Sequence, residues 1–306
     1  MVKSQAKSKL VVVLGPTASG KSDLAVELAL RFGGEVVSAD SRQVYRGLDI
    51  GSGKVTPEEM RGVPHHLLDV APASRVFTVS DYVRLAKETV QDILERDKLP
   101  VICGGTGFYI DALLYGESFA PVPPDAEIRK TLQTYTTEEL ALRLSELDPE
   151  RFASIDAKNR VRLVRALEIV MSTGKPVPKT SPVPLYEALK FGIIWTKEEL
   201  DRRIEIRLDR RLKSGMMEEV RRLKFRPSGR GLSWKRLYDL GLEYRFVSLH
   251  LKGELSYDDM RAQLLSAIKQ YAKRQMTWFK RDEKIVWLKP DELERAYELT
   301  EKFTKK

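Results

Sequence analysis

The feature that most constrains this chain is a glycine-rich stretch near its N-terminus. Residues 10–14 form an uninterrupted apolar run, which is typical of a strand buried on both faces. The residues that follow match the phosphate-binding pattern G-x-x-x-x-G-K-[ST]: Gly15, Pro16, Thr17, Ala18, Ser19, Gly20, Lys21 and Ser22. Residues 23–31 then have the composition of a helix. A strand, a loop of this kind and a helix in this order predict an α/β fold around a parallel sheet.

This loop predicts a binding site for a phosphate or diphosphate group. Its glycines allow several backbone N–H groups to turn toward one anion, and the helix behind it adds the positive end of its dipole. Lys21 supplies a full positive charge, and the Ser22 hydroxyl is placed to hold Mg²⁺. The pattern alone does not indicate which reaction follows.

The charge of the chain favours a polyanionic partner. Its 306 residues carry a net charge of +9, and residues 197–236 hold fourteen Lys or Arg against seven Asp or Glu. The single cysteine, Cys103, excludes a disulfide framework and suits a cytoplasmic protein. No apolar run approaches membrane-spanning length, and the run behind the basic N-terminus is too short for a signal peptide. We therefore expect a cytoplasmic protein that does not associate with membranes.

Two further strands are predicted, and each ends in a polar or glycine-rich segment. Residues 35–39 lead into Asp40, Ser41, Arg42 and Gln43, and residues 100–103 lead into the Gly-Gly-Thr-Gly sequence that contains Thr106. The carboxyl ends of parallel strands meet at one edge of a sheet, which is where ligands bind in α/β proteins. Asp40 and Thr106 are therefore expected beside the phosphate-binding loop, whereas residues 44–79 are expected to be mostly irregular.

The middle of the chain lacks strand patterns. Two proline-rich segments, 117–125 and 175–184, enclose predicted helices at 125–134, 137–147 and 158–172, and a strand pattern returns at 191–195. Helices are predicted at 197–224, 256–281 and 290–304, with a strand at 285–288. This order predicts a P-loop α/β core (1–117 and 189–306) with a basic, mostly helical C-terminal part. Residues 118–188 are predicted to form a helical insertion domain.

Several motifs, all in order along the chain, resemble the tRNA dimethylallyltransferase (tRNA isopentenyltransferase) family. Besides the loop at 15–22, they are SADSRQVYRGLDIG at 38–51, HHLLD at 65–69, GGTGFY at 104–109, RLVRALE at 162–168 and YAKRQMTWF at 271–279. Together the matches run from residue 11 to residue 281, nearly the whole chain. The resemblance implies transfer of a dimethylallyl group from dimethylallyl diphosphate to N6 of adenosine 37 of tRNA, with release of diphosphate.

The resemblance also gives roles to residues at the expected sheet edge. Asp40 is a candidate general base for the N6 proton, because an aromatic amine is a poor nucleophile while it keeps that proton. Thr17 and Thr106 are expected near the reacting atoms. Arg203 and Arg207 lie four residues apart on one predicted helix, and their guanidinium groups suit either the diphosphate oxygens, together with the loop and Mg²⁺, or the tRNA backbone. Whether a nucleoside triphosphate also binds this P-loop is left open.

The expected macromolecular partner is the anticodon stem-loop of tRNA. A stacked base cannot reach the bottom of a P-loop site, so the target adenosine is expected to flip out. Asp40, Ser41, Arg42, Gln43 and Thr106 are expected to contact it, and Tyr45 is suited to stacking on bases. The residues expected to grip the RNA are Arg129, Arg162 and Arg165 in the insertion, and Lys273, Arg274 and Trp278 near the end of the chain.

Two features set this chain apart within the family. Residues 239–245 read DLGLEYR where members usually have a Gly-Tyr-Lys-Glu-like segment, so no tRNA contact is carried over to this loop. The zinc finger of eukaryotic members is absent from this sequence, which has one cysteine and looks bacterial in type.

Other functions fit part of the same pattern. A P-loop small-molecule kinase shares the loop and the strand-end acid but does not need the basic 197–236 stretch. A prenyltransferase acting on free adenine nucleotides does not need the insertion, and a non-catalytic nucleic-acid-binding module does not need an intact P-loop with Asp40. We expect a monomeric transferase that uses dimethylallyl diphosphate and tRNA.

Overall fold

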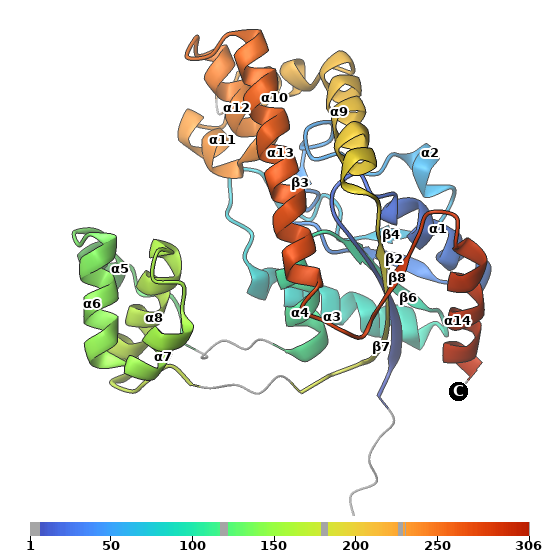
Figure 1. The fold of residues 1–306 in the computed structure, drawn as a ribbon, viewed down its shortest axis with the longest axis horizontal. Helices are drawn as coiled ribbons and strands as arrows, with labels where there is room; N and C mark the ends of the chain where they lie inside the picture. The colour runs from blue at the N-terminus through green and yellow to red at the C-terminus, as the bar shows by residue number, and fades with distance from the viewer. Residues whose placement is uncertain (1–6, 117–121, 179–182, 226–228, 230, 306) are drawn as a thin grey trace, which may run out of the picture. The chain divides into compact units, whose positions relative to one another are not determined.

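The computed structural model describes residues 7–116, 122–178, 183–225, 229 and 231–305 (Figure 1). The chain divides into two compact units, of which the first comprises Met1–Gly116 with Pro184–Lys306 and the second Glu117–Val183. No helix in the described ranges is long and apolar enough to cross a membrane.

A six-stranded parallel sheet forms the centre of the first unit, which confirms the predicted α/β class. The strands lie in the order β4-β2-β6-β1-β7-β8, and every neighbouring pair is parallel. Their bounds are β1 (Lys9–Leu14), β2 (Glu35–Ser38), β4 (His65–His66), β6 (Pro100–Gly104), β7 (Glu187–Ile193) and β8 (Ile285–Leu288). Strand β7 begins four residues before the predicted start at 191 and ends at Ile193 instead of 195. It begins early because Glu187 already pairs with Lys9 of β1.

Helices cover both faces of this sheet (Figure 1). Leu10, Val12 and Leu14 of β1 pack in one core with α3 (Val79–Glu95) and α4 (Gly107–Tyr115). Val11 and Val13 pack on the opposite face with α1 (Lys21–Phe32) and α14 (Leu293–Lys305). Side chains alternate across a strand, so an apolar run with no polar interruption is what a strand between two helical layers requires.

Five helices form a second core above the carboxyl edge of the sheet. They are α9 (Lys197–Lys213), α10 (Met216–Lys224), α11 (Trp234–Leu240), α12 (Leu242–Leu251) and α13 (Tyr257–Phe279). The helical region predicted for 197–224 consists of two helices, because Gly215 has φ 96° and separates α9 from α10. Helices α11 and α12 were not predicted. Helix α13 runs from this core toward the sheet (Figure 1), and Phe279 at its end packs in the same core as α3 and α4.

The segment predicted to be mostly irregular, 44–79, is anchored to these helices. It contains β3 (Tyr45–Arg46), α2 (Pro57–Met60), β4 and β5 (Ala71–Pro72). The buried carboxylate of Glu219 on α10 accepts N–H bonds from Asp49 (3.0 Å), Ile50 (2.7 Å) and Gly51 (3.0 Å), and the hydroxyl of Tyr244 donates to it at 2.9 Å. One buried acid therefore fixes three consecutive backbone groups of this loop.

The second unit has its own apolar core. Its helices are α5 (Ala126–Gln133), α6 (Thr137–Leu147), α7 (Pro149–Ser154) and α8 (Arg160–Thr173), of which only α7 was not predicted. The buried leucines of this core are Leu132, Leu140, Leu144, Leu163 and Leu167. A separate core allows these residues to pack as a unit.

Candidate functional site

The phosphate-binding loop lies at the carboxyl edge of the sheet, between β1 and α1. Gly20 has φ 90°, a conformation that glycine adopts without strain, and it precedes the first residue of α1. The ammonium group of Lys21 donates to the carbonyl of Pro16 at 3.2 Å, so it lies folded over the loop. The backbone N–H groups at the start of α1 and this ammonium form the anion site that the sequence predicts.

A single glutamine amide ties this loop to the next strand end. Gln275 of α13 accepts from the N–H of Thr17 at 2.9 Å and donates to the carbonyl of Gly105 at 2.8 Å. Its side chain is buried, and both of its polar ends are used. Gln275 therefore fixes the distance between the loop and the β6–α4 turn, although the sequence reasoning gave it no role.

Two arginines of α9 reach the same loop, as their four-residue spacing predicts. Arg207 donates to the hydroxyl of Thr17 at 2.7 Å, and Arg203 donates to the carbonyl of Ala18 at 2.9 Å. The Arg203 guanidinium also lies 4.4 Å from the ring centroid of Trp195, whose indole N–H donates to Ser19 O at 2.8 Å. Arg207 lines the cavity described below, whereas Arg203 supports the loop from outside that lining.

Asp40 stands at the end of β2 and organises the turn that follows. Its Oδ1 accepts from the N–H of Arg42 at 2.8 Å and from the N–H of Gln43 at 3.3 Å. No hydrogen bond to Oδ2 occurs among the described residues. One carboxylate oxygen therefore holds the turn, and the other is available to a ligand.

Thr106 links this turn to the start of α4. Its hydroxyl accepts from the N–H of Ser41 at 3.1 Å, and its own N–H donates to the carbonyl of Ala39 at 3.2 Å. A Cβ atom at Gly104 would lie 2.2 Å from that carbonyl, so the two strand ends approach too closely for any side chain there. Thr106 lies next to the Asp40 turn but is not among the residues that line the cavity.

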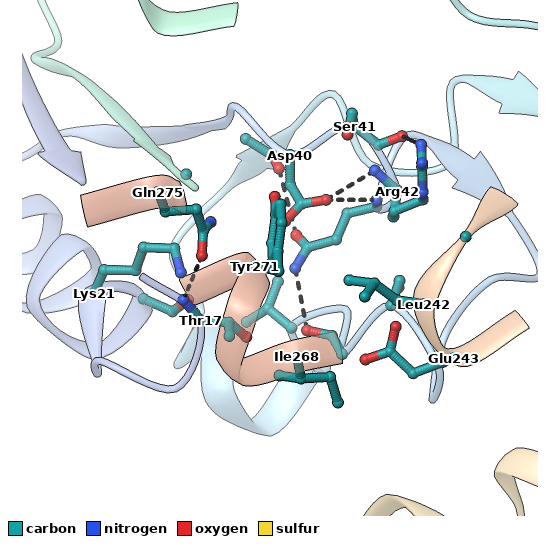
Figure 2. A pocket seen from close by; sticks show the side chains of 18 of the residues that line it. Thr17, Lys21, Asp40, Ser41, Arg42, Leu242, Glu243, Ile268, Tyr271 and Gln275 are labelled. Atoms are coloured by element: carbon teal, nitrogen blue, oxygen red, sulfur yellow. Dashed lines mark hydrogen bonds between the residues drawn. The ribbon is translucent and has the colours of Figure 1, made fainter. Parts of the chain in front are cut away.

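One cavity of about 390 Å³ joins the loop to the Asp40 turn. Figure 2 shows Lys21 and Thr17 on one side, Arg42 and Leu242 on the other, and Asp40 and Tyr271 between them. Of the residues predicted from sequence, those that line it are Thr17, Lys21, Ser22, Asp40, Ser41, Arg42, Gln43, Arg207 and Arg274. The structure thus brings the predicted diphosphate-binding and adenosine-binding residues into one space.

The phosphate end of this cavity is rich in poorly solvated positive charge. Burial lowers the pKa of Lys21 below its usual value, and the nearby Arg207 contributes in the same direction. Burial, followed by the charge of Arg211, lowers the pKa of Arg207 to about 9. Arg207 is still cationic at neutral pH, and an anion bound beside Lys21 and Arg207 would favour the protonated form of both groups.

This arrangement predicts how diphosphate binding depends on pH. An anion favours the protonated cations and raises their pKa values, so affinity is complete below the pKa values of the free protein and falls as pH rises through them. We expect the affinity for dimethylallyl diphosphate to decline above about pH 9, where Arg207 of the ligand-free protein titrates. Calorimetric titrations from pH 7 to pH 10 measure it, and an affinity that stays constant to pH 10 would show that these cations do not bind the diphosphate.

Besides Gln275, the sequence reasoning missed further cavity-lining residues, among them Arg211, Glu243 and Tyr271. Arg211 lies one further turn along α9 and pairs with Glu243 at 3.1 Å, and its guanidinium also donates to Gly51 O at 3.3 Å. Burial raises the pKa of Glu243, and it raises the pKa of Tyr271 to about 12, so this phenol stays a hydrogen-bond donor. A signal for Arg211 was present in the continued four-residue spacing after Arg207.

The segment that departs from the family pattern is not a loop but the end of α11, Gly241 and the start of α12, and it forms part of the cavity wall. The residues from Leu240 to Arg245 all line the cavity, and Leu242 has φ 37°, which is rare for a branched side chain. Backbone strain of this kind concentrates at functional sites.

Two side chains that were predicted to contact bases form hydrogen bonds within the protein instead. Tyr45 is 3% exposed and its hydroxyl accepts from Phe77 N–H at 2.9 Å, so the prediction that it stacks on bases is wrong. The Gln43 amide donates to Gly53 O at 3.1 Å and accepts from the Ser38 hydroxyl at 3.3 Å. Tyr45 lies in β3, which pairs with β5, and its ring is buried in the core that the helices α9 to α13 form.

Of the predicted RNA-gripping residues in the second unit, two are bound to a buried carboxylate. Glu168 is fully buried and accepts from Arg129 at 2.6 Å and 3.0 Å and from Arg165 at 2.6 Å. Arg129 therefore holds α5 to α8, whereas Arg165 lies on α8 together with Glu168, and a phosphate-binding role for both arginines remains a prediction. Arg162 is exposed on α8.

The predicted residues of α13 lie in different surroundings. Lys273 is exposed, and Arg274 lines the cavity with its guanidinium 5.8 Å from the centroid of the Tyr271 ring. The Trp278 indole N–H donates to Asp111 at 2.8 Å, which holds α13 against α4. Trp278 is thus partly structural and does not line the cavity.

Comparison with known proteins gives one consistent family. A sequence model of the IPP transferase family matches residues 43–282. The tRNA dimethylallyltransferase 2 of Pelobacter propionicus is 47% identical over 92% of this chain and 89% of its own length. The tRNA dimethylallyltransferase 1 of Geotalea uraniireducens is 44% identical over 92% of this chain and 93% of its own.

Solved structures agree with these sequence relatives. A tRNA isopentenylpyrophosphate transferase from Bacillus halodurans matches 98% of this chain and 96% of its own, with 34% identity and a TM-score of 0.71. A eukaryotic dimethylallyltransferase acting on tRNA shares the fold with a TM-score of 0.84 over 97% of this chain and 80% of its own, at 23% identity.

Proposed function

Because the chain belongs to the IPP transferase family of tRNA dimethylallyltransferases, we propose that it transfers a dimethylallyl group to N6 of adenosine 37 in tRNA. The donor is dimethylallyl diphosphate, and the products are N6-dimethylallyladenosine in the tRNA and free diphosphate. The observation that carries this proposal is the single cavity that joins Lys21 of the phosphate-binding loop to Asp40 at the next strand end. A P-loop small-molecule kinase would share this loop and this acid, so the donor and the acceptor must separate the two activities.

In the proposed reaction, the N6 nitrogen forms a bond to the first carbon of the dimethylallyl group while the bond from that carbon to the diphosphate oxygen breaks. The free oxygen of Asp40 takes the N6 proton, and its other oxygen remains fixed by the N–H groups of Arg42 and Gln43. The departing diphosphate is stabilised by Lys21, Arg207 and the loop N–H groups, which are preorganised for developing negative charge. Thr17 and Thr106 position these groups through the contacts described above.

The loop also fits Mg²⁺, which we propose as the cofactor. No cluster of three or more His, Cys, Asp or Glu in the described ranges could hold a metal, so the ion would depend on a few oxygens and the substrate phosphates, as Mg²⁺ usually does. The Ser22 hydroxyl lines the cavity beside Lys21, and the buried Ser19 hydroxyl has no hydrogen-bond partner among the described residues. When bound, Mg²⁺ would neutralise charge on the diphosphate.

The adenosine would reach this cavity as a flipped base. Asp40, Ser41, Arg42, Gln43 and Thr106 form or support the wall that it would meet, and Tyr271 offers a neutral hydroxyl. We further propose that the second unit, the insertion predicted at 118–188, binds the anticodon stem-loop with exposed Arg162 among its contacts. Lys273 and Arg274 would bind phosphates from α13. That the enzyme acts as a monomer in the cytoplasm remains a prediction.

The rival activities are separated by donor and acceptor. Release of diphosphate should require both dimethylallyl diphosphate and an unmodified anticodon stem-loop. Free adenosine or AMP should replace the stem-loop poorly, because neither can use the basic surfaces. Incorporation of phosphate from ATP into a small acceptor would instead support a kinase, and efficient prenylation of AMP would support a free-nucleotide enzyme.

A further inference from the structure

A row of aromatic side chains leads away from the edge of the cavity along α11. Trp234 and Tyr238 are four residues apart on this short helix, so they lie on one face. The helix ends at Leu240, and Leu240 and Gly241 belong to the cavity wall. Arg245 also lines the cavity and covers the Tyr238 ring, so the exposed face of α11 reaches the edge of the site.

Each aromatic ring of this row has a cation over it. The Arg245 guanidinium lies 4.3 Å from the centroid of the Tyr238 ring, and its Nε donates to Tyr238 O at 3.2 Å. The Lys224 ammonium lies 5.0 Å from the Trp234 ring and 6.0 Å from the Phe225 ring, and these two rings meet edge to face. We call Lys224, Phe225, Trp234, Tyr238 and Arg245 the α11 surface.

Packing within the protein does not explain the exposure of this surface. Tyr238 is 44% exposed and Phe225 is 66% exposed, whereas Leu237 and Leu240 of the same segment are fully buried and fill the core. Aromatic rings interleaved with cations are typical of surfaces that bind single-stranded nucleic acid, because the rings stack on bases and the cations attract phosphates. A protein or lipid partner would not need a cation over each ring.

We propose that the α11 surface binds single-stranded nucleotides next to the target adenosine, with one base stacked on the Tyr238–Arg245 pair. The proposal rests on the proposed function for the identity of the RNA. A base that flips out leaves its neighbours without a stacking partner, and an aromatic surface at the cavity edge supplies one. Arg245 connects the two places, because it lines the cavity and also covers Tyr238.

The test uses the full-length protein and two anticodon stem-loop RNAs. Each carries 2-aminopurine next to the target adenosine, on the 5′ side in one and on the 3′ side in the other. With wild-type protein, at least one of these probes should be quenched by stacking. Tyr238→Ala should make that probe brighter in the complex and weaken binding about tenfold.

Three further variants separate the effect of stacking from the effect of charge and from nonspecific effects of a substitution on the protein. Tyr238→Phe keeps the ring and should behave like wild type. Arg245→Lys keeps the charge but loses the planar group, and it should brighten the same probe. Tyr257→Ala removes a tyrosine of similar exposure, 47%, at the start of α13 and should change neither binding nor fluorescence.

Dimethylallyl transfer to saturating stem-loop is measured in the same samples. If wild type transfers the group but Tyr238→Ala and Arg245→Lys match wild type in affinity and in both probes, the α11 proposal is wrong and the proposed function stands. If wild type transfers nothing to any RNA but shows the Tyr238-dependent quenching, the α11 surface binds RNA and the proposed function is wrong.

Discussion

Replacing Asp40 by Asn is expected to slow the chemical step by about 10²–10⁴-fold, which is the usual contribution of a general base. Asn keeps an oxygen that can accept from the N–H groups of Arg42 and Gln43, so the turn at the end of β2 should survive. What it loses is the second, proton-accepting oxygen. Because proton transfer matters mainly in the transition state, kcat should fall while the KM values for both substrates change little.

The measurement is single-turnover transfer of a labelled dimethylallyl group with enzyme and RNA saturating. Asp23→Asn provides a matched control, because Asp23 is an exposed acid in the first turn of α1 and has no proposed role in the chemistry. Turnover of Asp40→Asn within tenfold of wild type would mean that Asp40 only positions the turn. Loss of RNA binding with an intact chemical step would make the segment a recognition element instead.

Lys21→Ala is expected to weaken binding of dimethylallyl diphosphate by about 30-fold or more. Removing one partner of a poorly solvated charge pair typically costs about 2–5 kcal/mol, and Lys21 is the only cationic side chain within the loop itself. The same change should not lower the melting temperature of the ligand-free protein. Burial disfavours the charged form of Lys21, as its lowered pKa indicates, so the folded protein gains little from this charge until an anion binds.

Calorimetric titration and thermal unfolding check the two parts of this prediction. Lys87→Ala serves as the control, because Lys87 is an exposed lysine on α3, away from the cavity lining. Unchanged affinity in Lys21→Ala would show that the diphosphate does not bind at the loop. A large drop in melting temperature would show that Lys21 stabilises the fold in ways its environment does not suggest.

The parts of the site that lie close together in sequence could be predicted. The phosphate-binding loop and the Asp40 turn each follow a buried strand, and the parallel sheet brings those strand ends to one edge. The spacing of Arg203 and Arg207 on a helix was also sufficient to place them together. In each of these cases the local pattern determines which element forms and at which end of it the side chain lies.

The remaining parts depend on contacts between distant segments. Gln275 joins Thr17 to Gly105, and Glu243 pairs with Arg211, but nothing near these residues in the sequence indicates their partners. For Tyr45, the sequence suggested a contact with bases, but the ring is buried inside the protein. The two-residue strands β3 and β5 carry no sequence pattern that would have indicated this burial. Long-range packing therefore decided which polar and aromatic side chains face the cavity.

Prenylation of one adenosine of tRNA by this protein can be tested with purified components. The most direct measurement incubates the protein with dimethylallyl diphosphate, Mg²⁺ and unmodified tRNA, and then identifies the modified nucleoside by mass and maps its position. A parallel reaction uses the same tRNA with guanosine in place of adenosine 37. We predict N6-dimethylallyladenosine at position 37 of the first RNA and no product in the second; no prenylated nucleoside in either, or equal product in both, would contradict the account.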